Sequence, residues 1–161
     1  MHSKSWLTTA IAAAAMLGAA CGTTTASPAA SPPLAAPTPA AGGATIAVAN
    51  DAKLGKILVD GSGKTVYLFV ADTGTASTCY TSCAAIWPPV LTAGAPQAST
   101  GAQASLLGTT TRTDGKIEVT YAGHPLYYFI QDKKAGDTTG QGVNGFGALW
   151  WVLSPSGAAM H

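Results

Sequence analysis

Two segments of this chain, sixty positions apart, are so similar that they indicate an internal duplication. Residues 55–72 align with residues 115–132 without a gap, and eight of the eighteen aligned positions are identical, where unrelated segments would share about one or two. We expect the two copies to pack into one core, because a single short repeat cannot cover its own apolar face. The identical pairs are Gly55/Gly115, Lys56/Lys116, Ile57/Ile117, Val59/Val119, Gly63/Gly123, Tyr67/Tyr127, Phe69/Phe129 and Asp72/Asp132.

Each copy has the pattern of a β-hairpin. Residues 56–70 and 116–130 are rich in Val, Ile, Thr, Tyr and Phe on both sides of a glycine-containing turn, a composition that suits pleated strands. Further strands are expected at 45–49, 106–112 and 148–153, and one short helical turn within 78–87, ended by two prolines. The sequence therefore predicts a mainly β fold, an internally duplicated antiparallel domain of sandwich or barrel-like type.

Each copy ends in the motif Tyr-x-Phe-x-x-Asp. In a strand, the Tyr and Phe share one face and the apolar residues beside them share the other, so we expect strands buried on both sides. The Asp precedes a turn, where its carboxylate can accept backbone N–H bonds. Alternatively, the Tyr of one copy can form a hydrogen bond with the Asp of the other copy. We predict a structural role, with a ligand site as the alternative, for Tyr67, Phe69, Asp72, Tyr127, Phe129 and Asp132.

The first twenty residues have the layout of a secretory signal peptide. A short basic start containing Lys4 precedes an apolar stretch at 7–17, which is too short to span a bilayer. Gly18-Ala19-Ala20 before Cys21 resembles a bacterial lipobox, although Gly18 stands where the usual motif has Leu. The resemblance implies a diacylglyceryl group on the Cys21 sulfur and a fatty acid such as palmitate on its amine. The alternative is an ordinary secreted protein with an unmodified cysteine.

A Pro/Ala/Thr-rich segment, residues 21–43 including the acylated cysteine, separates this start from the rest of the chain. It has almost no large apolar residue, so it is predicted to be a disordered, extended spacer. Residues 44–161 form the duplicated β domain, with repeats at about 45–100 and 105–157. The predicted location is outside the cytoplasm, anchored to the bacterial cell membrane by the N-terminal lipid.

The two remaining cysteines, Cys79 and Cys83, are predicted to form a disulfide, because thiols outside the cytoplasm are usually oxidised. Thiol–disulfide exchange or binding of a soft metal such as Cu(I) are alternatives. The nearest extra metal ligands would be His124, Met160 and His161, which the sequence does not bring together. His124, between Gly and Pro, is interpreted as an exposed turn residue.

These features together resemble the bacterial lipoproteins with a repeated Yx(FWY)xxD motif, a secreted repeat of unknown function. The resemblance spans nearly all of residues 44–161. It implies location and architecture but no mechanism. Besides the two motifs, it is carried by Cys79-x3-Cys83-x3-Trp87-Pro88-Pro89 and by Gly136-Asp137…Gly140-Gln141-Gly142…Trp150.

Charge and motif content argue against two broad functions. Without Lys4, seven basic and seven acidic residues balance, and a neutral chain without basic clusters is not expected to bind nucleic acid. The chain has no Gly-x-Ser-x-Gly and no His-Glu-x-x-His, so we predict that it is not an enzyme and needs no cofactor. Residues 136–147 lack the ending of a P-loop and are interpreted as a flexible or ligand-covering loop.

Two functional classes remain. The leading one is a non-enzymatic envelope lipoprotein, a tethered β domain that binds an envelope protein or serves structurally. The alternative class is a redox- or metal-linked envelope protein that uses Cys79 and Cys83. A third, weaker possibility is glycan or peptidoglycan binding by exposed Trp87, Trp150 or Trp151, and alternation places the last two on opposite faces.

Overall fold

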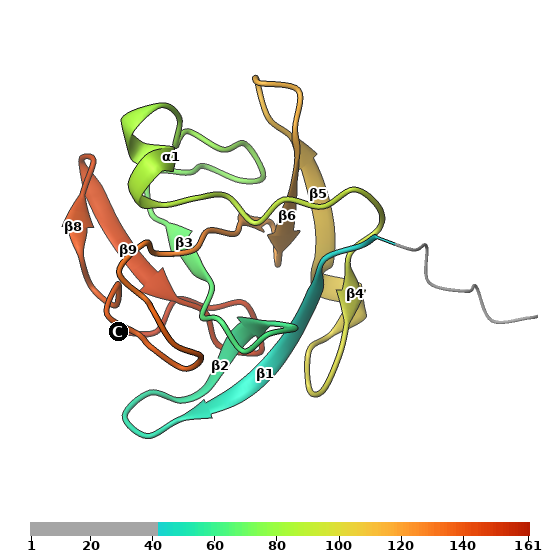
Figure 1. Ribbon diagram of the computed structural model, residues 1–161, viewed down its shortest axis with the longest axis vertical. Coiled ribbons are helices and arrows are strands. Elements are labelled where there is room, and N and C mark those ends of the chain that lie inside the picture. Colours follow the sequence, from blue (N-terminus) through green and yellow to red (C-terminus); the bar gives the residue numbers. More distant parts are fainter. Residues whose placement is uncertain (1–41) are drawn as a thin grey trace, which may run out of the picture. The chain divides into compact units, whose positions relative to one another are not determined.

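Three three-stranded sheets joined by loops make up residues 42–161, the part of the chain that the computed structural model describes (Figure 1). The prediction of a mainly β fold is confirmed. These described residues form three separate small sheets and no closed barrel. The predicted signal peptide, the predicted acylation site at Cys21 and the spacer up to residue 41 lie outside the described residues.

The first sheet has the order β2-β1-β4. Strand β1 (Thr45–Asp51) pairs antiparallel with β2 (Gly55–Asp60) and parallel with the short β4 (Gln97–Ala98). The β1–β2 turn is fixed locally, because the Asp51 carboxylate accepts hydrogen bonds from the backbone N–H groups of Lys53 and Leu54, at 2.8 and 2.7 Å. A short polar side chain thus sets the register of this hairpin.

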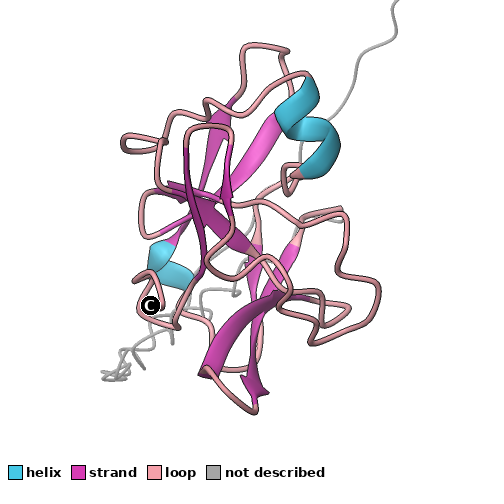
Figure 2. Cartoon of the chain, turned by 90° about the vertical axis from the view of Figure 1, so that its left-hand side faces the viewer, coloured by secondary structure: helices cyan, strands magenta, loops and turns pink. Residues whose placement is uncertain are grey.

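The other two sheets are built from short strands, and Figure 2 shows the strands, the helices and the loops that join them. The second has the order β3-β9-β8 and the third β5-β6-β7. Helix α1 (Ser82–Ile86) and a 3-10 turn at Ala104–Leu106 lie between strands. The remaining strands are β3 (Tyr67–Phe69), β5 (Leu107–Thr111), β6 (Ile117–Tyr121), β7 (His124–Pro125), β8 (Asn144–Gly145) and β9 (Ala148–Val152).

The strands expected at 45–49, 106–112 and 148–153 and the helical turn within 78–87 correspond to β1, β5, β9 and α1. Strands β4 and β8 were not predicted. The two copies of the hairpin also differ, because the first motif forms β3 whereas the second contributes only two isolated bridges at Tyr127, to Tyr67 and to Pro89. Pairing of the two motif segments is direct: Tyr67 and Tyr127 exchange both backbone hydrogen bonds, at 2.8 and 2.9 Å.

Strand β3 is buried on both sides, as its pattern predicted. Tyr67 and Phe69 belong to an aromatic core cluster, while Leu68 belongs to a second, mainly aliphatic cluster. All three side chains are buried. Val70, the next residue, is 51% exposed, so the double-sided burial ends at the edge of the strand.

The two copies exchange partners. The first motif pairs with the tryptophan segment of the second copy, since Tyr67 lies opposite Val152 and Phe69 opposite Trp150. The second motif pairs with the tryptophan segment of the first copy, residues 86–90: the Tyr128 N–H donates to the Pro88 carbonyl at 2.8 Å, and two further bonds join Val90 to Leu126 and Ile130 to Ile86. Neither copy closes its own core, and each completes the other.

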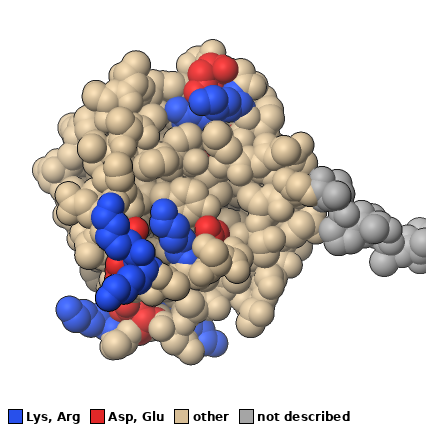
Figure 3. Space-filling view, in the orientation of Figure 1, with Lys and Arg blue, Asp and Glu red and all other residues tan. Residues whose placement is uncertain are grey.

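Charged side chains of both signs lie close together on the face seen in Figure 3. They form two groups with largely uncharged surface between them. At the β5–β6 turn, Asp114 lies 3.6 Å from Arg112 Nε and 3.8 Å from Lys116 Nζ. This face therefore presents mixed charge instead of a field of one sign.

Candidate functional site

The four polar side chains of the two motifs meet inside the domain. The Tyr67 hydroxyl donates to Asp132 Oδ2 and the Tyr127 hydroxyl donates to Asp72 Oδ2, each at 2.6 Å. Each bond therefore joins one copy to the other, which is the arrangement across repeats that the sequence left open. All four residues are buried, and such short bonds to a carboxylate are stronger than bonds between neutral groups.

Each motif carboxylate also holds the loop that follows it. Asp72 Oδ1 accepts from the backbone N–H of Thr78 at 2.7 Å and from its hydroxyl at 2.6 Å. Asp132 Oδ1 accepts from the N–H and hydroxyl of Thr139 in the same way. The expected role in fixing a turn is therefore seen, but the turn closes six or seven residues later and through a threonine.

The buried environment fixes the proton on the tyrosines. Burial raises the pKa of Tyr67 above its ordinary value, and the Asp132 carboxylate raises it further. Burial, followed by the charge of Glu118 and the bond to Asp72, likewise raises the pKa of Tyr127. The hydroxyls are donors and the carboxylates acceptors, with both oxygens of each carboxylate engaged. This arrangement holds the two copies together through the hydrogen bonds of both carboxylates.

Four aromatic rings stack beside these pairs. Trp87 and Trp150 lie parallel, with centroids 4.0 Å apart and an interplanar angle of 2°. Phe69 stacks on the outer face of Trp150 at 4.0 Å and Phe129 on that of Trp87 at 4.2 Å. Each phenylalanine therefore stacks on the tryptophan of the other copy, and the stack repeats the exchange seen in the backbone.

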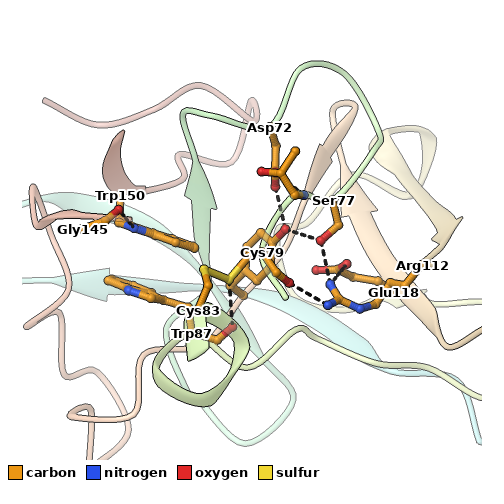
Figure 4. Close-up of a disulfide and its surroundings, with 11 residues drawn as sticks. Asp72, Ser77, Cys79, Cys83, Trp87, Arg112, Glu118, Gly145 and Trp150 are labelled. Carbon is orange, nitrogen blue, oxygen red and sulfur yellow. Dashed lines mark hydrogen bonds and ion pairs between the residues drawn. A yellow bond between two sulfur atoms is a disulfide. The ribbon is translucent and has the colours of Figure 1, made fainter. Parts of the chain in front are cut away.

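The predicted disulfide joins Cys79 to Cys83 at the start of α1, next to the parallel indoles (Figure 4). Cys79 is 0% exposed and Cys83 6% exposed. The Trp87 backbone N–H donates to the Cys83 carbonyl at 2.7 Å and closes the helix. The disulfide therefore fixes the segment that delivers Trp87 into the stack.

A buried ion pair extends this network into the third sheet (Figure 4). Arg112 Nη1 donates to Glu118 Oε2 at 2.7 Å and to the Ser77 hydroxyl at 2.6 Å, and its Nη2 donates to the Cys79 carbonyl at 2.7 Å. The Ser77 hydroxyl in turn lies 2.7 Å from that of Tyr127. Burial raises the pKa of Glu118 to about 7, although Arg112 opposes the rise.

Sequence reasoning did not single out Arg112, Glu118 or Ser77. One signal was present: the ungapped repeat alignment places Glu118 at the position of Leu58, and both side chains are fully buried. A carboxylate at a core position of a duplicated unit requires a buried partner. Nothing local in the sequence identifies that partner as Arg112.

An open pocket of about 480 Å³ lies where β3, β7, β9 and the last residues meet. Its walls are mainly apolar, with Leu68 inside and the exposed Val70 and Leu149 among its lining. Trp151 is half-buried in the wall, and the His161 imidazole meets it edge-on, with centroids 4.7 Å apart. The other lining groups include His124 and Asp72.

This geometry corrects two expectations. Trp87 and Trp150 are buried in the stack, so neither can present an exposed indole to a glycan, and only Trp151 of the three reaches a pocket. His124 is not an exposed turn residue but is half-buried in β7, where it pairs with Tyr121. Within residues 136–147, Gly140 packs against the aromatic core and Asn144–Gly145 form β8; a role of the segment in covering a ligand stays a prediction.

The extra metal ligands considered from the sequence do not gather at the disulfide. His124 and His161 line the pocket instead, and Met160 packs against the aromatic cluster. Among residues 42–161, no group of three or more His, Cys, Asp and Glu side chains is placed to hold a metal ion.

The fold and its contacts define a class: a duplicated, disulfide-containing β domain whose copies are interlocked through Tyr, Asp and Trp. Residues 48–91 and 108–154 match the profile of the family described as a secreted repeat of unknown function, and the chain belongs to this family. No curated protein and no solved structure gives a significant match. Within the described part of the chain, the helices are too short to cross a membrane.

Proposed function

We propose that the protein is a non-enzymatic lipoprotein of the bacterial cell envelope, a β domain that binds another molecule or serves structurally. Residues 1–20 would be removed as a signal peptide, lipid on Cys21 would hold the chain at the membrane, and the Pro-rich segment would keep the domain clear of it. Membership in a family of secreted repeats supports a place outside the cytoplasm.

The observation that carries the non-catalytic proposal is the saturation of the repeated motif. Both carboxylates are buried, and every oxygen accepts a hydrogen bond from a tyrosine or a threonine of the same domain. A general base must have an oxygen available for a proton of its substrate. Asp132 is buried, and Asp72, although it lines the open pocket, already accepts hydrogen bonds at both oxygens. The motif thus supports a scaffold that presents other surfaces for contact.

The partners we propose are the membrane, through the lipid, and an envelope protein or glycan. The balanced charge of the mature chain and the mixed charge in Figure 3 support a partner other than nucleic acid. Trp151 is the tryptophan of the three candidates that can take part in such contacts, since it lines the open pocket.

A redox role for the disulfide is the alternative. Exchange requires a thiolate to attack a sulfur directly, and both sulfurs belong to buried cysteines. This burial supports the structural role. A reduction potential above roughly −200 mV, typical of labile disulfides, would favour the redox alternative instead.

Metabolic labelling with an alkyne analogue of palmitate tests the anchor. Cys21→Ser should abolish the label and move the protein from the membrane fraction to the soluble or secreted fraction. Cys79→Ser/Cys83→Ser is the matched control, since it removes the other two cysteines and should keep both label and location. Label or membrane association that persists in Cys21→Ser would contradict the proposal.

A further inference from the structure

We propose that the pocket lined by Leu68, Leu149 and Trp151 is a binding site for a small, uncharged aromatic molecule that carries a hydrogen-bonding oxygen or nitrogen atom. Its volume of about 480 Å³ is within the range of small-molecule sites, which are concave and mainly apolar. The proposal deepens the binding role proposed above, but it does not depend on the lipid anchor.

The strongest support is a comparison within the molecule. The duplication relates Leu68 to Tyr128 and His124 to Lys64. In the other half, the larger Tyr128 side chain donates to Asp60 Oδ2 at 3.0 Å, and the Lys64 ammonium lies 4.9 Å from the centre of its ring. The position that corresponds to the pocket is therefore filled and covered by the protein itself.

The half that carries the pocket differs at each of these positions. Leu68 is shorter than a tyrosine and leaves space, and His124 replaces the covering lysine. The exchanged tryptophan segments differ too, because Trp151 follows the stacked Trp150 where Pro88 follows the stacked Trp87. Two copies of one unit have thus diverged into a closed half and an open half with an aromatic wall.

The wall fits a ring-containing ligand. Val70 and Leu149 are 51% and 36% exposed and line the pocket with the half-buried Trp151. The corresponding Ile130 and Ile86 of the closed half are 45% and 38% exposed, but a proline stands there at the position of Trp151, so Trp151 is what distinguishes this wall. The Val70 N–H donates to the Leu149 carbonyl at 3.0 Å, so these side chains are held next to each other by backbone pairing. Aromatic rings gain most on such a surface through stacking or edge contacts with the indole.

The polar groups favour an uncharged ligand. Neither His124 nor His161 has a side-chain hydrogen bond to residues 42–161, so each imidazole can donate or accept one bond from a ligand. Asp72 also lines the pocket, but Thr78 and Tyr127 already occupy its oxygens. Its charge disfavours an anion beside it, and the hydrogen bonds that both of its oxygens already accept reduce its attraction for a cation.

Two fluorescent probes with the same aromatic body test the proposal on the full chain. N-phenyl-1-naphthylamine is uncharged, and 8-anilinonaphthalene-1-sulfonate adds one sulfonate. Energy transfer from tryptophan to the first probe should show a saturable component with one site per chain, above any linear background from lipid. The sulfonate should bind at least tenfold more weakly.

Matched variants locate the site. Leu68→Tyr copies the closed half and should weaken binding of the uncharged probe at least tenfold. Leu149→Glu at the open half should weaken it at least fivefold, whereas Ile86→Glu, at the corresponding exposed position of the closed half, should leave it unchanged. If Leu68→Tyr does not fold, the comparison of Leu149→Glu with Ile86→Glu tests the site instead, because both of these residues are partly exposed and should tolerate substitution.

Three results would overturn the proposal: no saturable binding of the uncharged probe, equal effects of Leu149→Glu and Ile86→Glu, or tighter binding of the sulfonate. The anchor is tested separately by the fractionation of Cys21→Ser. If the uncharged probe does not bind but Cys21 is labelled as expected, only the binding-site proposal is rejected. If the anchor proposal fails, the result of the probe experiment is unaffected.

Discussion

The crossed Tyr–Asp bonds predict a specific pattern of energetic coupling. Tyr67→Phe removes one hydroxyl and keeps the ring, so packing is retained while Asp132 Oδ2 loses its donor at a site that is 3% exposed. Asp132→Asn keeps the shape of the other partner and removes its charge. Because the bond joins different copies, Tyr67 should couple to Asp132 and not to Asp72 of its own motif.

The magnitude follows from burial and charge. A hydrogen bond to a charged group contributes about 1.5–3 kcal/mol to stability, and a buried carboxylate left without its donor costs a similar amount. Tyr67→Phe also removes the acceptor of the Gly140 N–H, at 3.3 Å. We expect each single variant to lower the free energy of unfolding by about 2 kcal/mol, and Tm by roughly 6–10 °C.

Guanidinium unfolding with the disulfide intact, followed by tryptophan fluorescence, measures these values for two double-mutant cycles. The cycle of Tyr67→Phe with Asp132→Asn should give a coupling of about 1.5 kcal/mol, and that with Asp72→Asn less than about 0.5 kcal/mol. The reverse order would place the bonds within each motif and refute the exchange. Single variants that retain full stability would refute the structural role of the motif altogether.

Three further perturbations test other parts of the core. Gly140→Ala should lower stability by about 1–3 kcal/mol in thermal unfolding, because its Cβ would lie 2.8 Å from the Trp87 ring, whereas Gly145→Ala, with nothing nearer than 3.8 Å, should not. Burial raises the pKa of Glu118 from 4.5 to about 7, so the folded state binds more protons between these values. The free energy of unfolding should therefore fall by up to about 3 kcal/mol as pH rises from 4.5 to 7. Measured as a function of pH, this decrease should be lost in Glu118→Gln. A decrease that persists in the variant would exclude Glu118 as its source. Replacing both Cys79 and Cys83 by Ala should lower stability by about 2 kcal/mol, the value for so short a loop, and an unchanged denaturation midpoint would show that the disulfide is no staple.

The exchange of partners between copies has a consequence for folding. Each motif is completed by a tryptophan segment from the other copy, about 80 residues later for β3 and about 40 residues earlier for the second motif. Contacts of such separation form only after long loops close. Neither copy is therefore expected to fold as an independent unit, although the two have nearly the same pattern.

Much of the fold could be predicted from local features. Alternating apolar residues and glycine turns located β1, β2, β5, β6 and β9, and the two prolines after Trp87 located the end of α1. The burial of the motif strand on both sides was predicted from its apolar residues. The disulfide was predicted from the two neighbouring cysteines and the expected location outside the cytoplasm. These features depend on residues close in sequence, which is why the sequence alone was enough.

The tertiary structure decided which segments meet. Strand pairing is non-local, and many registers satisfy the same alternation of residues, so the sequence left open whether Tyr67 bonds to an aspartate of its own copy or of the other. The sequence also did not determine that Glu118 is buried against Arg112, or which of the three tryptophans are buried. The pocket depends on a difference of a few atoms between Leu68 and Tyr128, read against neighbours that only the folded chain supplies. The duplication itself was visible in the sequence; the interlocking of its copies and the opening of one half are properties of the packed core.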